Sequence, residues 1–210
     1  ELSPLSDMGL GGVAKLRGWL GGPFDNLSAL ANVDVRDLRL WDLPFADLAR
    51  SEIRWTDRTR LGFPNVEGQR GATRMRAAVE LDFQQTALLD LQYFVSQGRL
   101  ADIMGIFLQV EGVDARMDGT LELRGPVDAL GGESRLELTE IDLFGERFED
   151  GIATGYMDGG RFTLDEARIQ RREGAETLLA RGSVGAGWAA NIDLRSDGLR
   201  LEHSQLLQEL

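Results

Sequence analysis

The sequence predicts an all-β protein made of two tandem repeats. Two observations predict it. Short runs that alternate apolar and polar residues recur along the chain between glycine-rich turns, and alternation with period two is typical of half-buried β-strands. The turn motif Gly-Pro-x-Asp-x-Leu occurs twice, and its prolines, Pro23 and Pro126, lie 103 residues apart. The 26 glycines and only 5 prolines fit a chain with many turns between strands.

The same offset of 103 residues relates other parts of the chain. Leu89-Asp90-Leu91 falls on Ile192-Asp193-Leu194, and the apolar residues of the two stretches after each turn motif coincide. We therefore expect one repeat unit over residues 1–107 and a second over residues 108–210. We expect the two units to form one continuous structure that belongs to a longer chain.

The second unit shows the strand pattern more clearly. Leu136 and Leu138 alternate with charged neighbours, and the apolar set then changes phase to Ile141 and Leu143. The first unit changes phase at the same place, after Val35. One extra residue at this point predicts either a β-bulge or a break between two strands. With the remaining runs, we expect about seven short strands in each unit, joined mostly by hairpin turns.

One stretch in each unit departs from the strand pattern. Apolar residues at positions 100, 103, 104, 107 and 108 follow a helical spacing. We expect a short helix near residues 99–108 and a weaker one near residues 203–210. Each would act as a plug that covers the apolar face of the sheet locally.

Composition excludes several classes of function. The chain has no Cys, a single His (His203) and a single Lys (Lys15), with a net charge of −12. It can form no disulfide and no thiolate metal site, and imidazole clusters are excluded. An acidic chain is also a poor binder of nucleic acid. We expect no catalytic residue, metal, cofactor or membrane span in this segment.

The predicted strands carry one apolar and one charged face, and two arrangements would fit this pattern. In a closed β-sandwich a second sheet covers the apolar face. In a single, strongly curved sheet the apolar face would instead line a trough suited to acyl chains.

The second turn motif carries a resemblance that favours the trough. Residues 119–138 read Gly-Thr-Leu-Glu-Leu-Arg-Gly-Pro-Val-Asp-Ala-Leu-Gly-Gly-Glu-Ser-Arg-Leu-Glu-Leu, and Asp158-Gly159-Gly160-Arg161-Phe162 follows. This pattern resembles the repeats of the TamB and AsmA-like proteins of Gram-negative envelopes, although Leu130 stands where proline is common. The resemblance implies an elongated β-groove in a protein that is anchored in the inner membrane and spans the periplasm. Such proteins are implicated in moving phospholipid toward the outer membrane, and TamB also in assembling outer-membrane β-barrel proteins.

These inferences lead to one leading hypothesis and two alternatives. The leading hypothesis is a non-enzymatic periplasmic segment whose elongated, strongly curved antiparallel sheet binds or conducts phospholipid acyl chains between the two membranes. The first alternative is a chaperone or scaffold module that binds client strands of β-barrel or autotransporter proteins, with an outer-membrane β-barrel as partner. The second is a surface adhesin with a closed β-sandwich. The residues expected to line the groove are Val35, Leu40, Phe45, Leu81, Leu89, Leu91, Leu121, Leu123, Leu136, Leu138, Leu143, Ile152, Phe162, Leu164, Ile192 and Leu194.

Overall fold

The structure is a computed structural model that describes most of the chain as one antiparallel sheet of twelve strands with a single short helix. The described residues are 10–23, 28–40, 43–56, 59–84, 86–107, 112–126, 128–159, 161–171, 177–184 and 190–197. In chain order the elements are β1 (Leu10–Gly21), β2 (Ser28–Leu40), β3 (Leu43–Thr56), β4 (Arg60–Arg70), β5 (Thr73–Asp82), β6 (Leu88–Arg99), α2 (Leu100–Phe107), β7 (Val113–Pro126), β8 (Gly131–Leu143), β9 (Glu146–Asp158), β10 (Arg161–Gln170), β11 (Thr177–Val184) and β12 (Ala190–Asp197).

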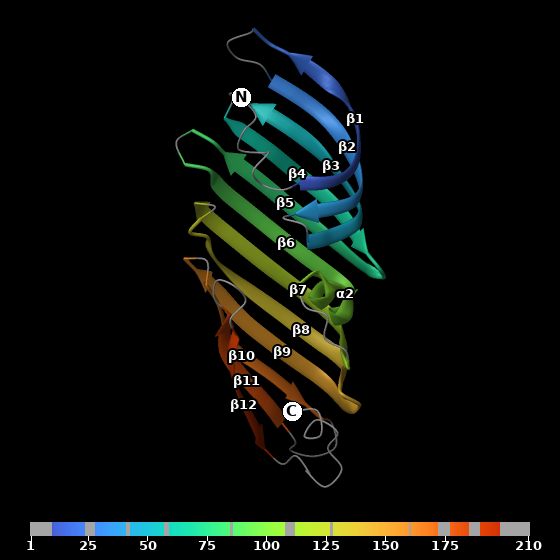
Figure 1. The fold of residues 1–210 in the computed structure, drawn as a ribbon, viewed down its shortest axis with the longest axis vertical. Coiled ribbons are helices and arrows are strands. Elements are labelled where there is room, and N and C mark those ends of the chain that lie inside the picture. Colours follow the sequence, from blue (N-terminus) through green and yellow to red (C-terminus); the bar gives the residue numbers. More distant parts are fainter. Residues whose placement is uncertain are drawn as a thin grey trace.

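Each strand pairs with the strand before it and the strand after it in the sequence. The strands therefore stack in chain order along the long axis of the molecule, with β1 at one end and β12 at the other (Figure 1). The two end strands do not pair with each other, so the sheet is open. The prediction of an all-β antiparallel fold is confirmed, and the described strands form a single sheet instead of the two sheets of a closed sandwich.

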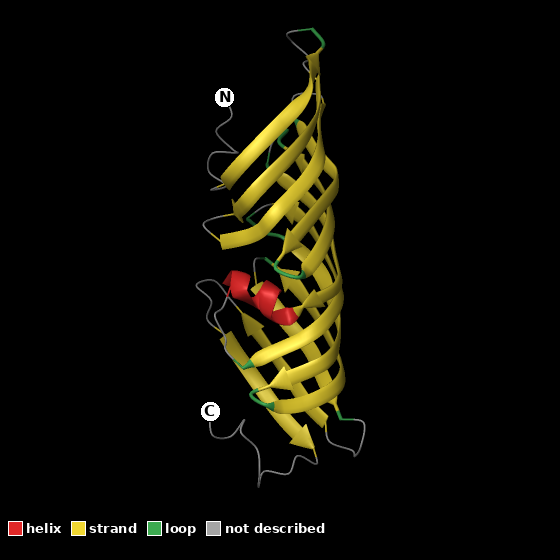
Figure 2. Ribbon diagram, turned by 90° about the vertical axis from the view of Figure 1, so that its right-hand side faces the viewer, coloured by secondary structure: helices red, strands yellow, loops and turns green. Residues whose placement is uncertain are grey.

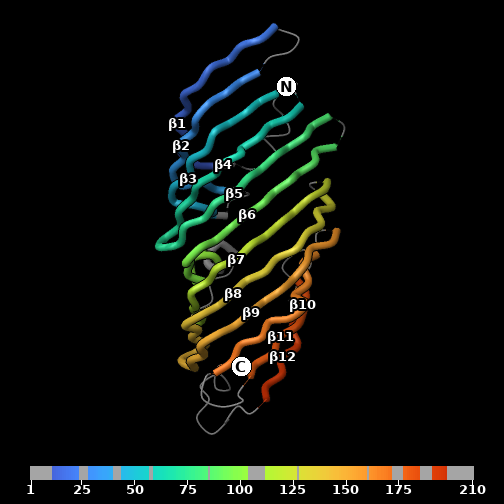
Figure 3. The backbone as a smooth tube through the Cα atoms, turned by 180° about the vertical axis from the view of Figure 1, so that it is seen from behind, coloured from blue at the N-terminus to red at the C-terminus, as the bar shows by residue number. Residues whose placement is uncertain are grey.

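The sheet is curved, and its two faces differ in what covers them. Helix α2 lies on the concave side about midway along the sheet (Figure 2). Seen from behind, the described strands of the convex side have no second layer over them (Figure 3). The helix predicted near residues 99–108 is confirmed as α2. The helix predicted near residues 203–210 lies outside the described residues.

Alternation along β8 shows why these residues form strands with two different faces. Leu136 and Leu138 are half-buried and buried, whereas Glu133, Arg135 and Glu137 between and beside them are exposed. Successive side chains of a strand point to opposite faces of the sheet, so the apolar set gathers on one side.

The phase change after Leu138 is a β-bulge inside one strand. Glu140 has a φ of 50°, in the left-handed region, and the strand continues through Ile141 with its side chain on the same face as that of Leu138. Asp37, 103 residues earlier, has a φ of 53° within β2. Because the chain passes through the bulge instead of stopping there, the described strands are longer and fewer than the fourteen or so expected.

Positive φ angles also set the hairpin turns. The β8–β9 turn consists of Phe144 and Gly145, with φ angles of 53° and 86° between the paired residues Leu143 and Glu146. Positive φ at both central residues is the mark of a type I′ turn, whose twist matches that of the strands beside it. The Gly-Pro pair that ends β7 places Gly125 at a φ of 118°, a region that L-residues with a side chain avoid.

The convex face carries cross-strand ion pairs. Arg50 on β3 pairs with Asp34 on β2 at 2.8 Å, and Arg124 on β7 pairs with Asp90 on β6 at 3.3 Å. These side chains are largely exposed, so each pair contributes at most about 1 kcal/mol. They add charge to the uncovered face, which also exposes large apolar side chains such as Trp19 and Phe94, and charged side chains oppose aggregation of a sheet that has no second layer on that side.

Candidate functional site

The candidate functional site is the apolar concave face of the sheet, defined here by the strand positions that point toward the same side as the residues packed against α2. Cross-strand pairing carries this face continuously across the middle of the sheet. Leu61 pairs with Leu81, which pairs with Leu89, and the neighbouring row joins Leu91 to Leu123. On β7 the concave-face positions are all uncharged: Val113, Ala115, Met117, Gly119, Leu121 and Leu123.

Burial on this face falls from the middle of the sheet toward its two ends. Leu81, Leu123 and Leu138 in the middle strands are buried. At the ends, the concave-face residues are largely exposed, at 62% and 67% for Leu16 and Leu20 on β1 and at 55% and 49% for Ile192 and Leu194 on β12. Within the described part of the chain, an end strand has a neighbour on one side only, so its apolar side chains are less covered than those of the middle strands.

Helix α2 joins two buried clusters of the concave face. One cluster centres on Met117, Leu138 and Phe148, the other on Ala46 and Met75. Ile103 of the helix and Tyr93 of β6 pack against both clusters. The helix therefore occupies the concave face at the point where the two halves of the sheet meet, as expected for a plug.

Polar contacts fix the start of α2 to the β4–β5 turn. The Asp102 carboxylate accepts hydrogen bonds from the backbone N–H groups of Ala72 and Thr73, both at 3.1 Å, and from the Thr73 hydroxyl at 2.8 Å. The Arg70 guanidinium donates to the Asp102 carbonyl oxygen at 2.7 Å. Thr73 is fully buried, so this carboxylate satisfies polar groups of a turn that would otherwise lie unpaired beneath the helix.

Tyr93 is a half-buried phenol of this face. Its ring meets that of Phe45 edge to face, with the centroids 6.3 Å apart, and its hydroxyl donates a weak hydrogen bond to the sulfur of Met75 at 3.4 Å. Burial raises the pKa of Tyr93 to about 12, so the phenol stays neutral over the physiological range. It contributes packing to the face instead of acid–base chemistry.

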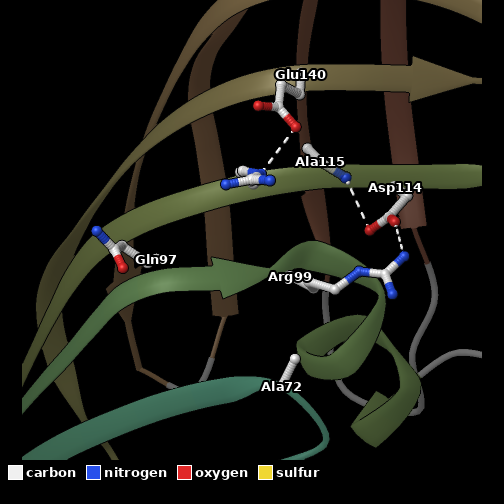
Figure 4. Close-up of a pocket in the computed structure, with 7 residues that line it drawn as sticks. Ala72, Gln97, Arg99, Asp114, Ala115 and Glu140 are labelled. Carbon is white, nitrogen blue, oxygen red and sulfur yellow. Dashed lines mark hydrogen bonds and ion pairs between the residues drawn. The ribbon is translucent and has the colours of Figure 1, made fainter.

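A polar cavity of about 420 Å³ lies beside α2 where β6, β7 and β8 meet (Figure 4). Its charged side chains neutralise one another, because Arg99 pairs with Asp114 and Arg116 pairs with Glu140. Burial alone would raise the pKa of Asp114, but the hydrogen bonds from Arg99 and from two backbone N–H groups outweigh it and lower that pKa. With its charges already paired, this cavity offers no uncompensated charge to a ligand.

The structure places most of the predicted lining residues on the concave face. Leu81, Leu123 and Leu138 are buried there, and Ile192 and Leu194 are exposed. The half-buried members are Val35, Phe45, Leu89, Leu91, Leu121, Leu136, Leu143, Phe162 and Leu164. The side chain of Leu40 lies outside what the structure describes.

The prediction that Ile152 lines the groove is wrong. It pairs with Glu137 on β8 and Arg168 on β10, both on the convex face, whereas the concave partner of Leu138 is Gly151. Alternation along β9 shifts phase between Phe148 and Gly151, so the apolar residue that continues the sequence pattern points to the other side.

Several concave residues were missed by the sequence reasoning. Met75, Met117, Val95 and Tyr93 form the centre of the face around the helix. A bulge separates Val95 from the end of β6, where Gln97 has a φ of 51°. The bulge breaks the alternation that could have identified Val95 as a concave-face residue. Small residues such as Ala115 carry no strong apolar signal in the sequence.

Comparisons with known proteins add no relative. No family model matches the chain, and neither the curated proteins nor the solved structures contain a match. Among the described residues, no helix is long and apolar enough to cross a membrane, and no three His, Asp or Glu side chains are grouped to hold a metal ion. The fold and the site define an open, single-sheet β-protein whose concave face is apolar and interrupted by one helix.

Proposed function

We propose that this chain is a non-enzymatic segment of a periplasmic protein, anchored in the inner membrane, whose concave face binds the acyl chains of phospholipids and conducts them between the two membranes. The observation that carries the proposal is the apolar face that continues over all twelve strands and leaves large apolar side chains exposed on β1 and β12. Exposed apolar surface of this kind marks sites for lipids or protein partners.

Acyl chains suit this face because it offers apolar contact with little polar recognition. Each methylene group that leaves water contributes about 0.8 kcal/mol, so even a partly covered chain would be held by several such groups. The paired register of Leu91 with Leu123 and Tyr93 with Leu121 gives rows of apolar side chains across neighbouring strands. A chain lying along the sheet would meet a new row at every strand.

The resemblance to the TamB and AsmA-like repeats supports the same proposal. The motif at residues 119–138 forms the β7–β8 hairpin, and its Gly-Pro pair lies at the turn, where Ala129 N–H donates to the Pro126 carbonyl at 2.9 Å. The motif therefore forms a hairpin of the sheet that bears the apolar face. The resemblance implies that this apolar face is the lipid-binding part of the protein.

Site-specific photocrosslinking tests the proposal. Leu194 on the concave face and Leu30 on the convex face are equally exposed, at 49%, so they form a matched pair. With a benzophenone amino acid at either position and phospholipid vesicles present, we expect a lipid adduct from position 194 and none from position 30. Equal labelling of both positions, or no labelling at 194, would contradict lipid binding by the concave face.

A second pair of variants tests the middle of the face. Leu121 is half-buried on the concave side, and its neighbour Thr120 is exposed on the convex side. Leu121→Arg should reduce the phospholipid that copurifies with the chain several-fold by native mass spectrometry, whereas Thr120→Arg should leave it unchanged. Circular dichroism of both variants establishes that each is folded before the lipid is counted.

The outer edges of β1 and β12, which no described strand occupies, favour a second candidate function. An end strand presents unpaired backbone groups to which an extended client segment can add as a further strand. This would suit a chaperone module for outer-membrane β-barrel or autotransporter proteins. In the same photocrosslinking experiment, carried out with an unfolded barrel protein present, this candidate predicts client peptide instead of lipid attached at position 194.

A further inference from the structure

Helix α2 covers only part of the concave face in the middle of the sheet (Figure 2). Around the helix, Met75 on β5, Val95 on β6 and Met117 on β7 are buried on this face. They belong to the two clusters against which Ile103 of the helix packs. Protein side chains therefore already occupy this part of the face, and it offers little surface to a ligand.

Further along the same strands, the concave face is less covered. Its half-buried residues there are Ala77 and Val79 on β5, Leu91 on β6 and Leu121 on β7, and these four define what we call the partly exposed strip. Val79 lies opposite Leu91, and both Ala77 and Leu121 lie opposite Tyr93. The strip is uncharged and crosses the middle of the sheet alongside the residues that the helix covers.

The strip continues onto the strands on either side. On β4, Phe63 lies opposite Val79 and Val66 lies opposite Ala77, and both are half-buried. On β8, Leu136 is half-buried on the same face. Partly exposed apolar residues thus follow one another from β4 to β8. An acyl chain that lies over them passes α2 without displacing it.

Polar contacts oppose any displacement of the helix. Asp102, in the first turn of α2, accepts a hydrogen bond from the fully buried Thr73 hydroxyl, and that hydroxyl oxygen accepts one from the backbone N–H of Arg99. Arg70 donates to the Asp102 carbonyl oxygen. Movement of the helix away from the β4–β5 turn would leave buried polar groups without partners, which is costly in free energy.

We propose that α2 is a fixed wall and not a gate: acyl chains pass the middle of the sheet along the partly exposed strip while the helix stays docked. This inference rests on the lipid-binding function proposed above, and it adds where lipid lies at the centre of the face. On β5 only Ala77 and Val79 lie on this face between the buried Met75 and Leu81. A larger side chain at either of the two positions should therefore obstruct the passage.

Photocrosslinking along β7 tests the position of the lipid. A small diazirine amino acid, close in size to leucine and methionine, is placed at position 121 in the strip or at position 117 beside the helix, with phosphatidylcholine vesicles present. We expect a lipid adduct from position 121 and none from position 117. An adduct at 117 would overturn the proposal. Lipid attached at position 194 but not at 121 would overturn it too, while leaving lipid binding by the concave face intact.

A disulfide that locks the helix tests whether α2 has to move. The chain has no cysteine of its own, and a Cβ atom at Gly71 would lie 2.8 Å from the Asp102 Cγ atom, within reach of a disulfide. Gly71→Cys with Asp102→Cys, oxidised, should give the same adduct yield at position 121 as the unlocked chain. A several-fold loss that reduction restores would show that the helix acts as a gate. Gly71→Cys alone is the control, because Gly71 has a φ of 54°.

Two adjacent alanines test the width of the strip. Ala77 and Ala78 are both half-buried, but Ala77 faces the concave side beside Tyr93, whereas Ala78 lies opposite Gln92 on the convex side. Ala77→Phe should lower the adduct yield at position 121 several-fold, and Ala78→Phe should leave it unchanged, with circular dichroism establishing that both are folded. Equal yields in the two variants would overturn the proposal. If the wild-type chain acquires lipid at neither 121 nor 194, the lipid-binding function itself fails, and this inference fails with it.

Discussion

The Thr73 hydroxyl donates a hydrogen bond of 2.8 Å to the carboxylate of Asp102, and through it the turn between β4 and β5 holds the start of helix α2. The same Thr73 oxygen accepts a hydrogen bond from the backbone N–H of Arg99, also at 2.8 Å, at the end of β6. Three elements thus meet at one buried hydroxyl, which fixes where the helix leaves the sheet and where it lies on the concave face.

Removal of the Asp102 carboxylate should loosen the helix. Asp102→Ala removes the acceptor of the buried Thr73 N–H and leaves the Thr73 hydroxyl only the longer contact of 3.5 Å to the Arg99 carbonyl, which costs about 1–3 kcal/mol of unfolding free energy. Asp102→Asn keeps one acceptor oxygen and should recover part of the loss. Urea denaturation measures the stability, and hydrogen exchange of the helix amides should be faster in Asp102→Ala. Unchanged exchange in that variant would show that apolar packing alone positions the helix.

Gly132 marks a close approach between β7 and β8. A Cβ atom at this position would lie 1.8 Å from the Glu122 carbonyl oxygen, whereas at the neighbouring Gly131 the nearest atom would be 3.7 Å away. Gly132→Ala should therefore lower the unfolding free energy by about 1–3 kcal/mol, because the two strands must separate. Gly131→Ala is the matched control and should be close to neutral. Thermal unfolding of both variants makes the comparison.

The bulge residue Glu140 should reject β-branched side chains. Its φ of 50° lies in the left-handed region, which costs an L-residue about 1–2 kcal/mol and costs a β-branched one more. Glu140→Val should destabilise the protein by roughly that amount, and Glu140→Gly should not. Glu137→Val, at an exposed position of the same strand with ordinary backbone angles, is the control. Equal losses in the two valine variants would argue against the strained backbone.

The raised pKa of Tyr93 makes stability depend on pH in the alkaline range. The folded-state pKa of about 12 lies above the ordinary tyrosine value of 10.0, so the unfolded chain loses its proton first as the pH rises. The stabilisation is complete below pH 10 and falls toward pH 12, by about 2–3 kcal/mol at most. Tyr93→Phe should remove this decline in urea denaturation series. In Tyr156→Phe, which leaves Tyr93 as the only tyrosine, phenolate absorbance should appear only near pH 12.

Alternation in the sequence was sufficient to assign residues to the correct face of the sheet where the pattern lies within one regular strand. Leu121 and Leu123 on β7, and Leu136 and Leu138 on β8, were correctly grouped because each pair lies two residues apart on a regular strand. Helix α2 was found for the same reason, since its apolar spacing is contained within eight residues.

Alternation failed to identify the concave-face positions where packing requires small residues. The concave positions of β9 after the phase change are Gly151, Ala153 and Gly155, which give no apolar signal, while Ile152 between them does. The reason is steric. A Cβ atom at Gly151 would lie 2.7 Å from Ile169 and 2.9 Å from Ile141, so the side chains of neighbouring strands already fill that space.

The β8–β9 turn and the placement of the helix depend on features that alternation does not encode. Phe144 resembles an apolar core residue in the sequence, yet it takes a positive φ at the turn beside Gly145. The position of α2 depends on Asp102 reaching a turn thirty residues earlier, and a spacing pattern contains no such distance.

The pairing of every strand with its neighbours in the sequence has a consequence for how the chain acquires its structure. A hairpin can form as soon as its two strands have been synthesised, and it then offers an edge on which the following strand can assemble. Folding can therefore proceed in the direction of synthesis, without waiting for a distant segment to close the sheet. The same property would let evolution lengthen or shorten the protein by whole hairpins, since each addition at an end leaves all existing strand pairs intact.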